Sequence, residues 1–387
     1  MVKTTDEIEE RKQLAYDLLS DGIDEADLEL HPDPNLLPQD AALTADLGIP
    51  FPDGLAPVPQ APDPNIDTRA PLPQADVLVV TWTVDENDAL ADVFTPGFAR
   101  KVWNRYNRDF EQKYLPFIRP GAPAWMAKRL GSWLLTTVGQ QSVLCFKSEL
   151  HLNQDGIRNA VQPGEATLPV KDMWIQLIEE VKPKVVLTVG TAGGLFLEHD
   201  LGDVAVSRGV KFRLASEFKN APYAHAMYKS EWTIPTQHFE KATELMQTFA
   251  AKLKEPPLLG PTARHTGQPL KAPTFTPKIQ QDGVGGIPEF HPVLTTDFFE
   301  YGTSTNGLEQ EGLAVEMGDA VLGMVASEMA NPPRWAAIRN LSDPQINGNL
   351  AKTLRNLYAV WYYKEYGYWT SVMSSLATWA IIAGLED

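Results

Sequence analysis

Apolar and polar positions follow two different periods along the chain from about residue 75. The runs 77–80 and 185–189 are apolar or β-branched at nearly every position, which is typical of strands buried on both faces of a sheet. Similar short runs recur further along. The predicted strands cover residues 75–83, 142–146, 148–152, 185–189, 204–207 and 335–338.

Between these strands, apolar residues recur every three or four positions, which is the period of a helix with one packed face. Met173, Trp174, Leu177 and Ile178 show this spacing clearly. The predicted helices cover residues 4–20, 84–90, 171–181, 236–253, 316–329 and 350–382. Strands that alternate with helices predict an α/β fold with three layers, a mixed twisted sheet flanked by helices.

Proline sets the N-terminal part of the chain apart. It recurs every few residues between 31 and 73, and it excludes regular helix and sheet. We therefore divide the chain into an N-terminal helix with a Pro-rich extension, residues 1–75, and an α/β domain, residues 76–387, with an irregular insertion around 216–290. The extension fits either a solvated linker or a strap that wraps a neighbouring subunit.

Two further stretches have an unusual composition. Residues 103–130 are aromatic and basic, which fits an anion site, a subunit contact or, most commonly, a surface helix. Residues 366–385 carry no charge, but Trp369, Met373 and Leu376 recur at helical spacing. This pattern predicts a buried or interface-forming helix rather than a membrane span.

The formal net charge of −17 over 387 residues argues against nucleic acid as a partner, because polyanions select basic surfaces. One cysteine, Cys145, and an N-terminus without the order of a secretion signal predict a cytoplasmic protein. Cys145 lies in an apolar run and is expected to be a buried structural thiol. The seven histidines are scattered, so we expect neither a metal nor another cofactor.

Small residues follow the strand at 185–189, namely Gly190, Thr191, Ala192, Gly193 and Gly194. Glycines let the backbone turn sharply and bring its N–H groups close to a ligand. Ligands bind at the carboxyl ends of strands in open α/β sheets, so this stretch predicts a binding site. A tight turn without a ligand is the alternative.

Five short motifs occur in the order in which a known family carries them. They are the stretches 190–195 with 201–207 (GTAGGL and LGDVAVS), 296–299 (TDFF), 314–317 (AVEM) and 337–343 (AIRNLSD), together with Glu86 after the first strand. This order resembles the nucleoside phosphorylase/nucleosidase superfamily, closest in pattern to methylthioadenosine/S-adenosylhomocysteine nucleosidase. The resemblance runs from about residue 76 to the C-terminus and implies the nucleoside phosphorylase-like fold.

The resemblance also implies cleavage of an N-glycosidic bond, in which the leaving purine is protonated and a nucleophile attacks C1′ of the sugar. It makes Asp343 the general acid at purine N7, positioned by Ser342, and a desolvated pocket would keep that acid protonated by raising its pKa. Phe299 would stack on the base and Met317 would line the ribose. The residues implied to contact substrate or nucleophile are Thr191, Ala192, Gly193, Phe299, Glu316, Met317 and Asp319.

Hydrolysis is favoured over phosphorolysis. Phosphorylases of this superfamily place one arginine two residues before the motif glycine and another in the loop after the first strand. This chain has Thr188 and an acidic loop with Glu86 there. A carboxylate repels phosphate but can orient and deprotonate water, so we assign Glu86 as the base, or Asp85 if the register shifts by one. An acidic first helical turn without catalytic role is the alternative.

One position departs from the family. The usual Glu-Met-Glu, whose last glutamate binds the ribose 2′- and 3′-hydroxyls, reads Glu316-Met317-Gly318 in this chain. A different sugar contact from Glu316 or Asp319, an altered sugar, or loss of activity would each follow from this change.

The 5′ side of the substrate is open at this stage. Basic residues near the site would hold 5′-phosphates, for example those of ATP, or would lie in solvated loops; they are Lys211, Arg213, Lys219, Arg264, His265, Lys271 and Lys278. The sequence thus predicts a hydrolytic N-glycosidase for a purine nucleoside or nucleotide, with adenine favoured, acting as a homo-oligomer away from nucleic acid and membranes. A phosphate-dependent phosphorylase and a non-catalytic nucleotide sensor or scaffold are the alternatives.

Overall fold

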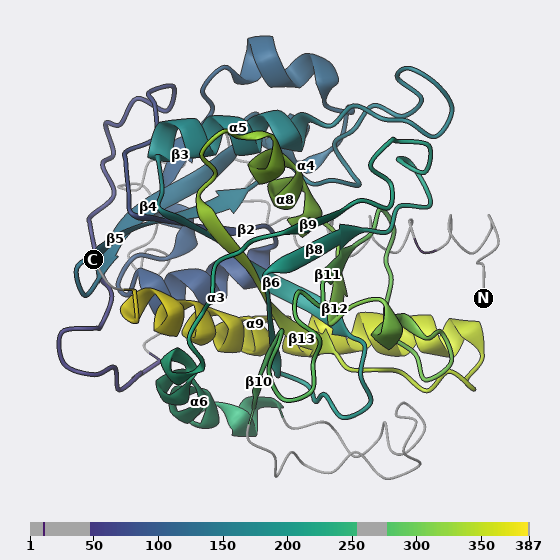
Figure 1. The fold of residues 1–387 in the computed structure, drawn as a ribbon. Helices are drawn as coiled ribbons and strands as arrows, with labels where there is room; N and C mark the ends of the chain where they lie inside the picture. Colours follow the sequence, from purple (N-terminus) through teal and green to yellow (C-terminus); the bar gives the residue numbers. More distant parts are fainter. Residues whose placement is uncertain (1–10, 12–46, 254–276, 386–387) are drawn as a thin grey trace.

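One large mixed sheet forms the centre of the protein (Figure 1). The structure is a computed structural model that describes residue 11, residues 47–253 and residues 277–385. Its strands are β1 (Val58–Pro59), β2 (Val77–Thr81), β3 (Asn104–Tyr106), β4 (Gly131–Val138), β5 (Gln141–Ser148), β6 (Val185–Gly194), β7 (Val204–Ser207), β8 (Gly209–Phe212), β9 (Met227–Lys229), β10 (Ile279–Gln281), β11 (Val293–Thr295), β12 (Ala314–Glu316) and β13 (Arg334–Asp343). Its α-helices are α3 (Val84–Phe94), α4 (Pro123–Ala127), α5 (Pro169–Val181), α6 (Phe239–Gln247), α8 (Asp319–Glu328) and α9 (Lys352–Ala383).

Strand β6 is the hub of the sheet. It pairs in parallel with β2 and with β13, and its last residues pair antiparallel with β12. Strand β5 lies parallel to β2 on the far side. The carboxyl ends of β2, β5, β6 and β13 therefore lie at one edge of the sheet, where open α/β sheets bind ligands.

Helices cover both faces of the sheet, which confirms the predicted three layers. Helices α3, α6 and α9 pack on one face, and α5 and α8 pack on the other (Figure 1). Alternate residues of β2 divide between these two cores, with Val77 and Val79 in the first and Leu78 and Val80 in the second. The strand is buried on both faces, as its unbroken apolar run predicts.

Most of the predicted elements are confirmed, with differences at the ends and in the irregular parts. Five predicted strands have counterparts in the structure: 75–83 in β2, 142–146 in β5, 185–189 in β6, 204–207 in β7 and 335–338 in β13. Four predicted helices also have counterparts: 84–90 in α3, 171–181 in α5, 236–253 in α6 and 350–382 in α9. The predicted helix at 4–20 lies outside the described residues apart from Arg11. The strands that were not predicted are β1, β3, β4, β8, β9, β10, β11 and β12.

Three of the predicted elements are wrong. No strand covers 148–152, because Ser148 Oγ accepts a hydrogen bond from the Leu150 amide and turns the chain at the end of β5. The helix predicted from 316 begins at Asp319, because 314–316 pair as β12. A surface helix does not fill 103–130, since prolines interrupt it; β3, a π-turn and the short α4 replace it.

The Pro-rich extension, where it is described, lies against its own chain. The expectation that this segment forms no regular sheet is wrong at β1, where Val58 and Pro59 pair with Thr137 and Thr136 of β4. The Leu55 carbonyl accepts a hydrogen bond of 2.8 Å from the indole N–H of Trp379 in α9. The described residues 47–75 are therefore not a free linker, and a contact of this extension with a neighbouring subunit stays a prediction. Helix α9 is packed as predicted, and no helix among the described residues has the length and apolarity to span a membrane.

Candidate functional site

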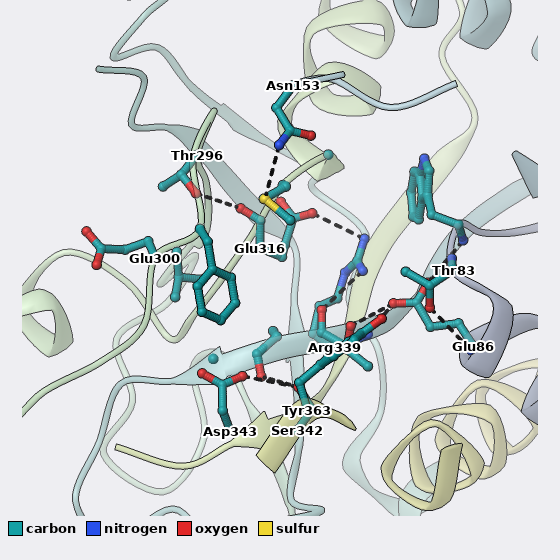
Figure 2. A pocket seen from close by; sticks show the side chains of 18 of the residues that line it. Thr83, Glu86, Asn153, Thr296, Glu300, Glu316, Arg339, Ser342, Asp343 and Tyr363 are labelled. Carbon is teal, nitrogen blue, oxygen red and sulfur yellow. Dashed lines mark hydrogen bonds and ion pairs between the residues drawn. The ribbon is translucent and has the colours of Figure 1, made fainter. Parts of the chain in front are cut away.

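A cavity opens at the sheet edge formed by the ends of β2, β5, β6 and β13 (Figure 2). It contains about 740 Å³ of empty space, a volume that includes its open mouth. Its walls bring together side chains that are far apart in the sequence. They are Trp82, Thr83, Glu86, His151, Asn153, Thr191, Ala192, Gly193, Thr296, Phe299, Glu300, Val315, Glu316, Met317, Gly318, Arg339, Ser342, Asp343 and Tyr363.

The glycines of β6 do not form the predicted turn. The strand continues through Gly194, and neither Gly190, Gly193 nor Gly194 has a positive φ. Gly190 and Gly193 are needed because two acidic side chains approach the backbone closely at these two positions. A Cβ at Gly190 would lie 2.5 Å from Glu86 Oε1, and one at Gly193 would lie 2.9 Å from Asp343 Oδ2.

Asp343 ends β13 and presents its carboxyl group to the cavity with few polar neighbours. Its side chain is 3% exposed, Oδ1 accepts a hydrogen bond of 3.1 Å from Ser342 Oγ, and Oδ2 has no hydrogen-bond partner among the described residues. Burial raises the pKa of Asp343 to about 8, against a smaller lowering by Ser342. At neutral pH this side chain is mainly a neutral carboxylic acid with a proton to donate.

Glu86 is equally buried but surrounded by donors. It is the third residue of α3 and closes a capping box with Thr83, whose amide donates to Oε2 at 2.9 Å. The Trp82 amide and Thr81 Oγ1 also donate to Oε2, each at 3.0 Å. The amide and hydroxyl of Thr191 donate to Oε1, each at 2.8 Å. These bonds join the end of β2, the start of α3 and β6 at one carboxylate.

The two influences on Glu86 oppose one another. Burial acts to raise its pKa, but Arg339 and the hydrogen bonds from Thr191 and Thr83 outweigh burial, and the pKa lies below its ordinary value. Glu86 is therefore ionised at neutral pH. Asp85, the alternative to it, does not line the cavity; its carboxylate lies 2.9 Å from where a Cβ of Gly367 in α9 would be.

Arg339 binds several acidic groups at the floor of the cavity. Its Nε donates to Asp319 Oδ2 at 2.8 Å and its Nη2 contacts Asp319 Oδ1, while Nη2 lies 3.4 Å from Glu316 Oε2. The guanidinium also stacks on Trp82, 4.9 Å from the ring centroid. Asp319 is thereby fully engaged, does not line the cavity, and is not positioned to contact a substrate as the sequence suggested.

Glu316, Met317 and Gly318 form one wall. Burial, together with the nearby Asp319, raises the pKa of Glu316, and Glu316 Oε1 accepts hydrogen bonds from Thr295 Oγ1 and from the Asp319 amide at 2.9 Å. A Cβ at Gly318 would lie 3.5 Å from the Trp82 ring. This is an ordinary van der Waals distance, so the indole lies against Gly318 without a clash.

The segment after β11 supplies a further part of the wall with Phe299. The Asp297 carboxylate fixes this segment by accepting the backbone N–H groups of Ala215, Ser216 and Phe218. Phe299 is 8% exposed, and its amide donates to the Arg11 carbonyl at 3.3 Å. The aromatic ring that was predicted to stack on a base therefore lies in the wall of the cavity.

The basic residues that were candidates for holding 5′-phosphates do not reach the cavity. Arg213 pairs with Glu300 at 3.2 Å, and Lys211 pairs with Glu311 at 3.4 Å. Lys219 and Lys278 do not line it, and Arg264, His265 and Lys271 lie outside the described residues. In 103–130, Arg119 pairs with Glu217 and Arg129 with Glu149, which leaves no anion site at these two residues.

The cavity gathers every predicted site residue except Asp319, namely Glu86, Thr191, Ala192, Gly193, Phe299, Glu316, Met317, Ser342 and Asp343. Sequence reasoning missed Trp82, His151, Arg339 and Tyr363. Arg339 could have been found from the sequence, because a single charged residue inside an apolar strand must pair with an acidic residue. Tyr363, in α9, forms a hydrogen bond with Thr83, and nothing in the sequence pattern pointed to its place in the cavity. No group of three or more metal-ligating side chains occurs in the part of the chain that the structure describes.

No family model and no curated protein matches the sequence. Among solved structures, the fold is similar to 5′-methylthioadenosine/S-adenosylhomocysteine nucleosidase from Neisseria meningitidis in complex with methylthio-immucillin-A, at 14% identity and a TM-score of 0.45, covering 80% of this chain and 100% of that one. It is also similar to futalosine hydrolase of Helicobacter pylori, at 11% identity and a TM-score of 0.44, covering 80% and 97%. The apo 5′-methylthioadenosine nucleosidase of Arabidopsis thaliana gives 16% identity and a TM-score of 0.40, covering 81% and 98%. Likenesses of this degree assign no function, so the cavity's own residues carry the argument.

Proposed function

We propose that the protein is a hydrolytic N-glycosidase that cleaves the base from a purine nucleoside. The observation that carries this proposal is a pair of buried carboxyl groups in one cavity with opposite ionisation. Both side chains lie in the wall of the cavity (Figure 2). At neutral pH Asp343 holds its proton and Glu86 has lost its own. Such a pair supplies an acid and a negative charge at the same pH.

Asp343 is the proposed general acid. As the bond between C1′ and N9 breaks, its electron pair passes to the purine, and the proton of Asp343 moves to N7 of the leaving base. Ser342 Oγ donates to Asp343 Oδ1, so it orients the carboxyl and stabilises the carboxylate that remains. Phe299 would cover one face of the base by stacking.

Glu86 is the proposed partner of the attacking water. Loss of the base leaves an oxocarbenium-like sugar, whose positive charge the Glu86 carboxylate stabilises. Water attacks C1′, one of its protons passes to Glu86, and the sugar gains a hydroxyl. Five donors lower the basicity of Glu86, so its main contribution is electrostatic; the water becomes acidic only as it bonds to the cation.

The charges around the cavity favour water over phosphate. Arg339 is the only lysine or arginine among the described residues that line it, and Asp319 and Glu316 already engage its guanidinium. A phosphate would have no free cation there and would be repelled by Glu86. We therefore favour hydrolysis over phosphorolysis, and for the same reason a nucleoside over ATP.

The test is release of free base from adenosine, methylthioadenosine, AMP and ATP, each with and without phosphate. We expect phosphate-independent release from a nucleoside, with free ribose or its 5′-substituted form as the second product. Release that requires phosphate and yields a sugar 1-phosphate would instead establish the phosphorylase. Binding without release from any of the four would establish the non-catalytic sensor.

A further inference from the structure

The cavity contains a buried histidine for which the reaction described above has no use. His151 follows β5, is 7% exposed and lines the cavity. Its Nε2 is buried and has no hydrogen-bond partner among the described residues. Buried polar atoms are nearly always satisfied, so an unsatisfied one in the wall of a cavity indicates a missing ligand group.

The His151 imidazole is held in place and is uncharged. Its backbone amide donates to the Asp155 carboxylate and its carbonyl accepts from the Gln154 amide at 3.4 Å, so the turn that carries it is fixed. Burial, with the nearby Lys147, lowers the pKa of His151 to about 4, against a smaller raising by Glu149 and Glu86. The ring is therefore neutral at physiological pH.

Its neighbours place it near Glu86 and Met317. The charge of Glu86 acts to raise the pKa of His151. Asn153, two residues further on, donates to Met317 Sδ at 3.6 Å (Figure 2). The segment 151–153 thus faces the part of the cavity where the proposed reaction puts the sugar, between Met317 and Glu86.

The chemistry of a neutral imidazole restricts the group that it can bind. Nε2 donates or accepts a single hydrogen bond according to the tautomer, and a hydroxyl can complement either. A phosphate would gain no opposite charge from it and would meet the ionised Glu86 on the same side. We propose that His151 binds a hydroxyl of the substrate's sugar portion, so that the substrate class is a nucleoside with that hydroxyl free and unphosphorylated; this rests on the proposed function.

The experiment combines one substitution with removal of each sugar hydroxyl. Base release is measured for wild type and His151→Ala with adenosine and its 2′-, 3′- and 5′-deoxy analogues. For adenosine we expect His151→Ala to lower kcat/KM by about 10- to 100-fold, the effect of leaving one buried polar group unpaired. One of the three analogues lacks the hydroxyl that His151 binds. For that analogue, wild type should already show a kcat/KM lower than for adenosine by this factor, and His151→Ala should lower it no further.

Two further variants separate this role from a structural one. His151→Gln keeps a group that can donate or accept and should recover part of the activity, and it carries the test if His151→Ala does not fold. His199→Ala removes another buried imidazole, 3% exposed and with its pKa similarly lowered to about 4, that does not line the cavity. It should leave kcat/KM for all four substrates near that of wild type.

Unchanged adenosine cleavage in His151→Ala would overturn the proposal, as would an equal loss for adenosine and all three analogues. If wild type releases no base from any substrate, the proposed function fails instead. The same comparison is then made on Kd by calorimetry with adenosine and its three analogues. Failure of the reaction and failure of the hydroxyl contact are therefore distinguishable.

Discussion

Asp343 and Glu86, two of the carboxyl groups that line the cavity, are buried to the same extent, 3% exposed each, yet they ionise in opposite directions. Around Asp343, one hydroxyl donates to Oδ1 and nothing among the described residues bonds to Oδ2. Around Glu86, three amides and two hydroxyls donate, and Arg339 lies nearby. Burial alone therefore does not set protonation; the number of donors within reach decides it.

The largest expected effect follows from removing the acidic proton. In Asp343→Asn the amide keeps the shape and the bond from Ser342, and its NH₂ can occupy the unpartnered site of Oδ2. We expect kcat for base release to fall roughly 10²- to 10⁴-fold, the usual contribution of a general acid. Thermal unfolding at pH 7 should show a Tm equal to or above that of wild type. Retained activity would remove Asp343 from the mechanism.

Glu86→Gln should differ from Asp343→Asn by costing stability as well as activity. Both Glu86 oxygens accept hydrogen bonds, so the NH₂ of glutamine must face at least one backbone N–H. We expect the free energy of unfolding to drop by about 1–3 kcal/mol and kcat to fall about 10²- to 10³-fold. Denaturant titration beside the activity assay checks both. A Glu86→Gln variant as stable as wild type would show that the five hydrogen bonds donated to Glu86 do not stabilise the fold.

The pH dependence should show both ionisations. Asp343 must be protonated and its pKa is raised to about 8, so kcat/KM should fall about tenfold per unit above pH 8. Because the folded pKa exceeds the unfolded one near 3.8, the stability that protonated Asp343 contributes is present below pH 3.8 and lost as pH rises to about 8. Glu86, with its lowered pKa, behaves oppositely, and its contribution is lost in acid.

The difference in unfolding free energy between wild type and Asp343→Asn therefore changes with pH. The variant should become progressively more stable relative to wild type between pH 4 and pH 8, as measured by denaturant titration at each pH. A difference independent of pH would mean that Asp343 is not protonated in the folded protein.

The glycines of β6 provide the smallest and most local test. Gly190→Ala would place a methyl 2.5 Å from Glu86 Oε1 and 2.7 Å from Arg339 Nη1, and Gly193→Ala one 2.9 Å from Asp343 Oδ2. We expect each to lower the free energy of unfolding by about 1–3 kcal/mol, with Gly190→Ala the larger, and to reduce activity.

Gly194→Ala is the matched control on the same strand. Its nearest contacts to an added Cβ are 3.4 Å, so the methyl fits in ordinary contact. We expect stability and base release near those of wild type. Equal losses in all three variants would show that β6 is merely intolerant of side chains, not shaped around two carboxyl groups.

Part of the site could be predicted because short motifs of the chain resemble those of a known family. That resemblance singled out Glu86, Ser342 and Asp343, which all line the cavity. The stretch 190–194 was predicted to be a binding site; three of its residues line the cavity, but the strand continues through it without the sharp turn that was expected. Arg339, His151 and Tyr363 come from three different elements, and only their packing gives them a common neighbour. The distances between residues of different elements cannot be read from the sequence alone.

The sequence by itself determined the alternation of strands and helices, the burial of Cys145 and the α/β class, because the periods of apolar residues depend only on local geometry. Only the tertiary structure decided which charges meet. It paired Arg339 with Asp319, set Lys211 and Arg213 against Glu311 and Glu300, and left Asp343 Oδ2 without a hydrogen-bond partner among the described residues. Protonation depends on donors and charges within a few ångströms, and these come from residues that are far apart along the chain.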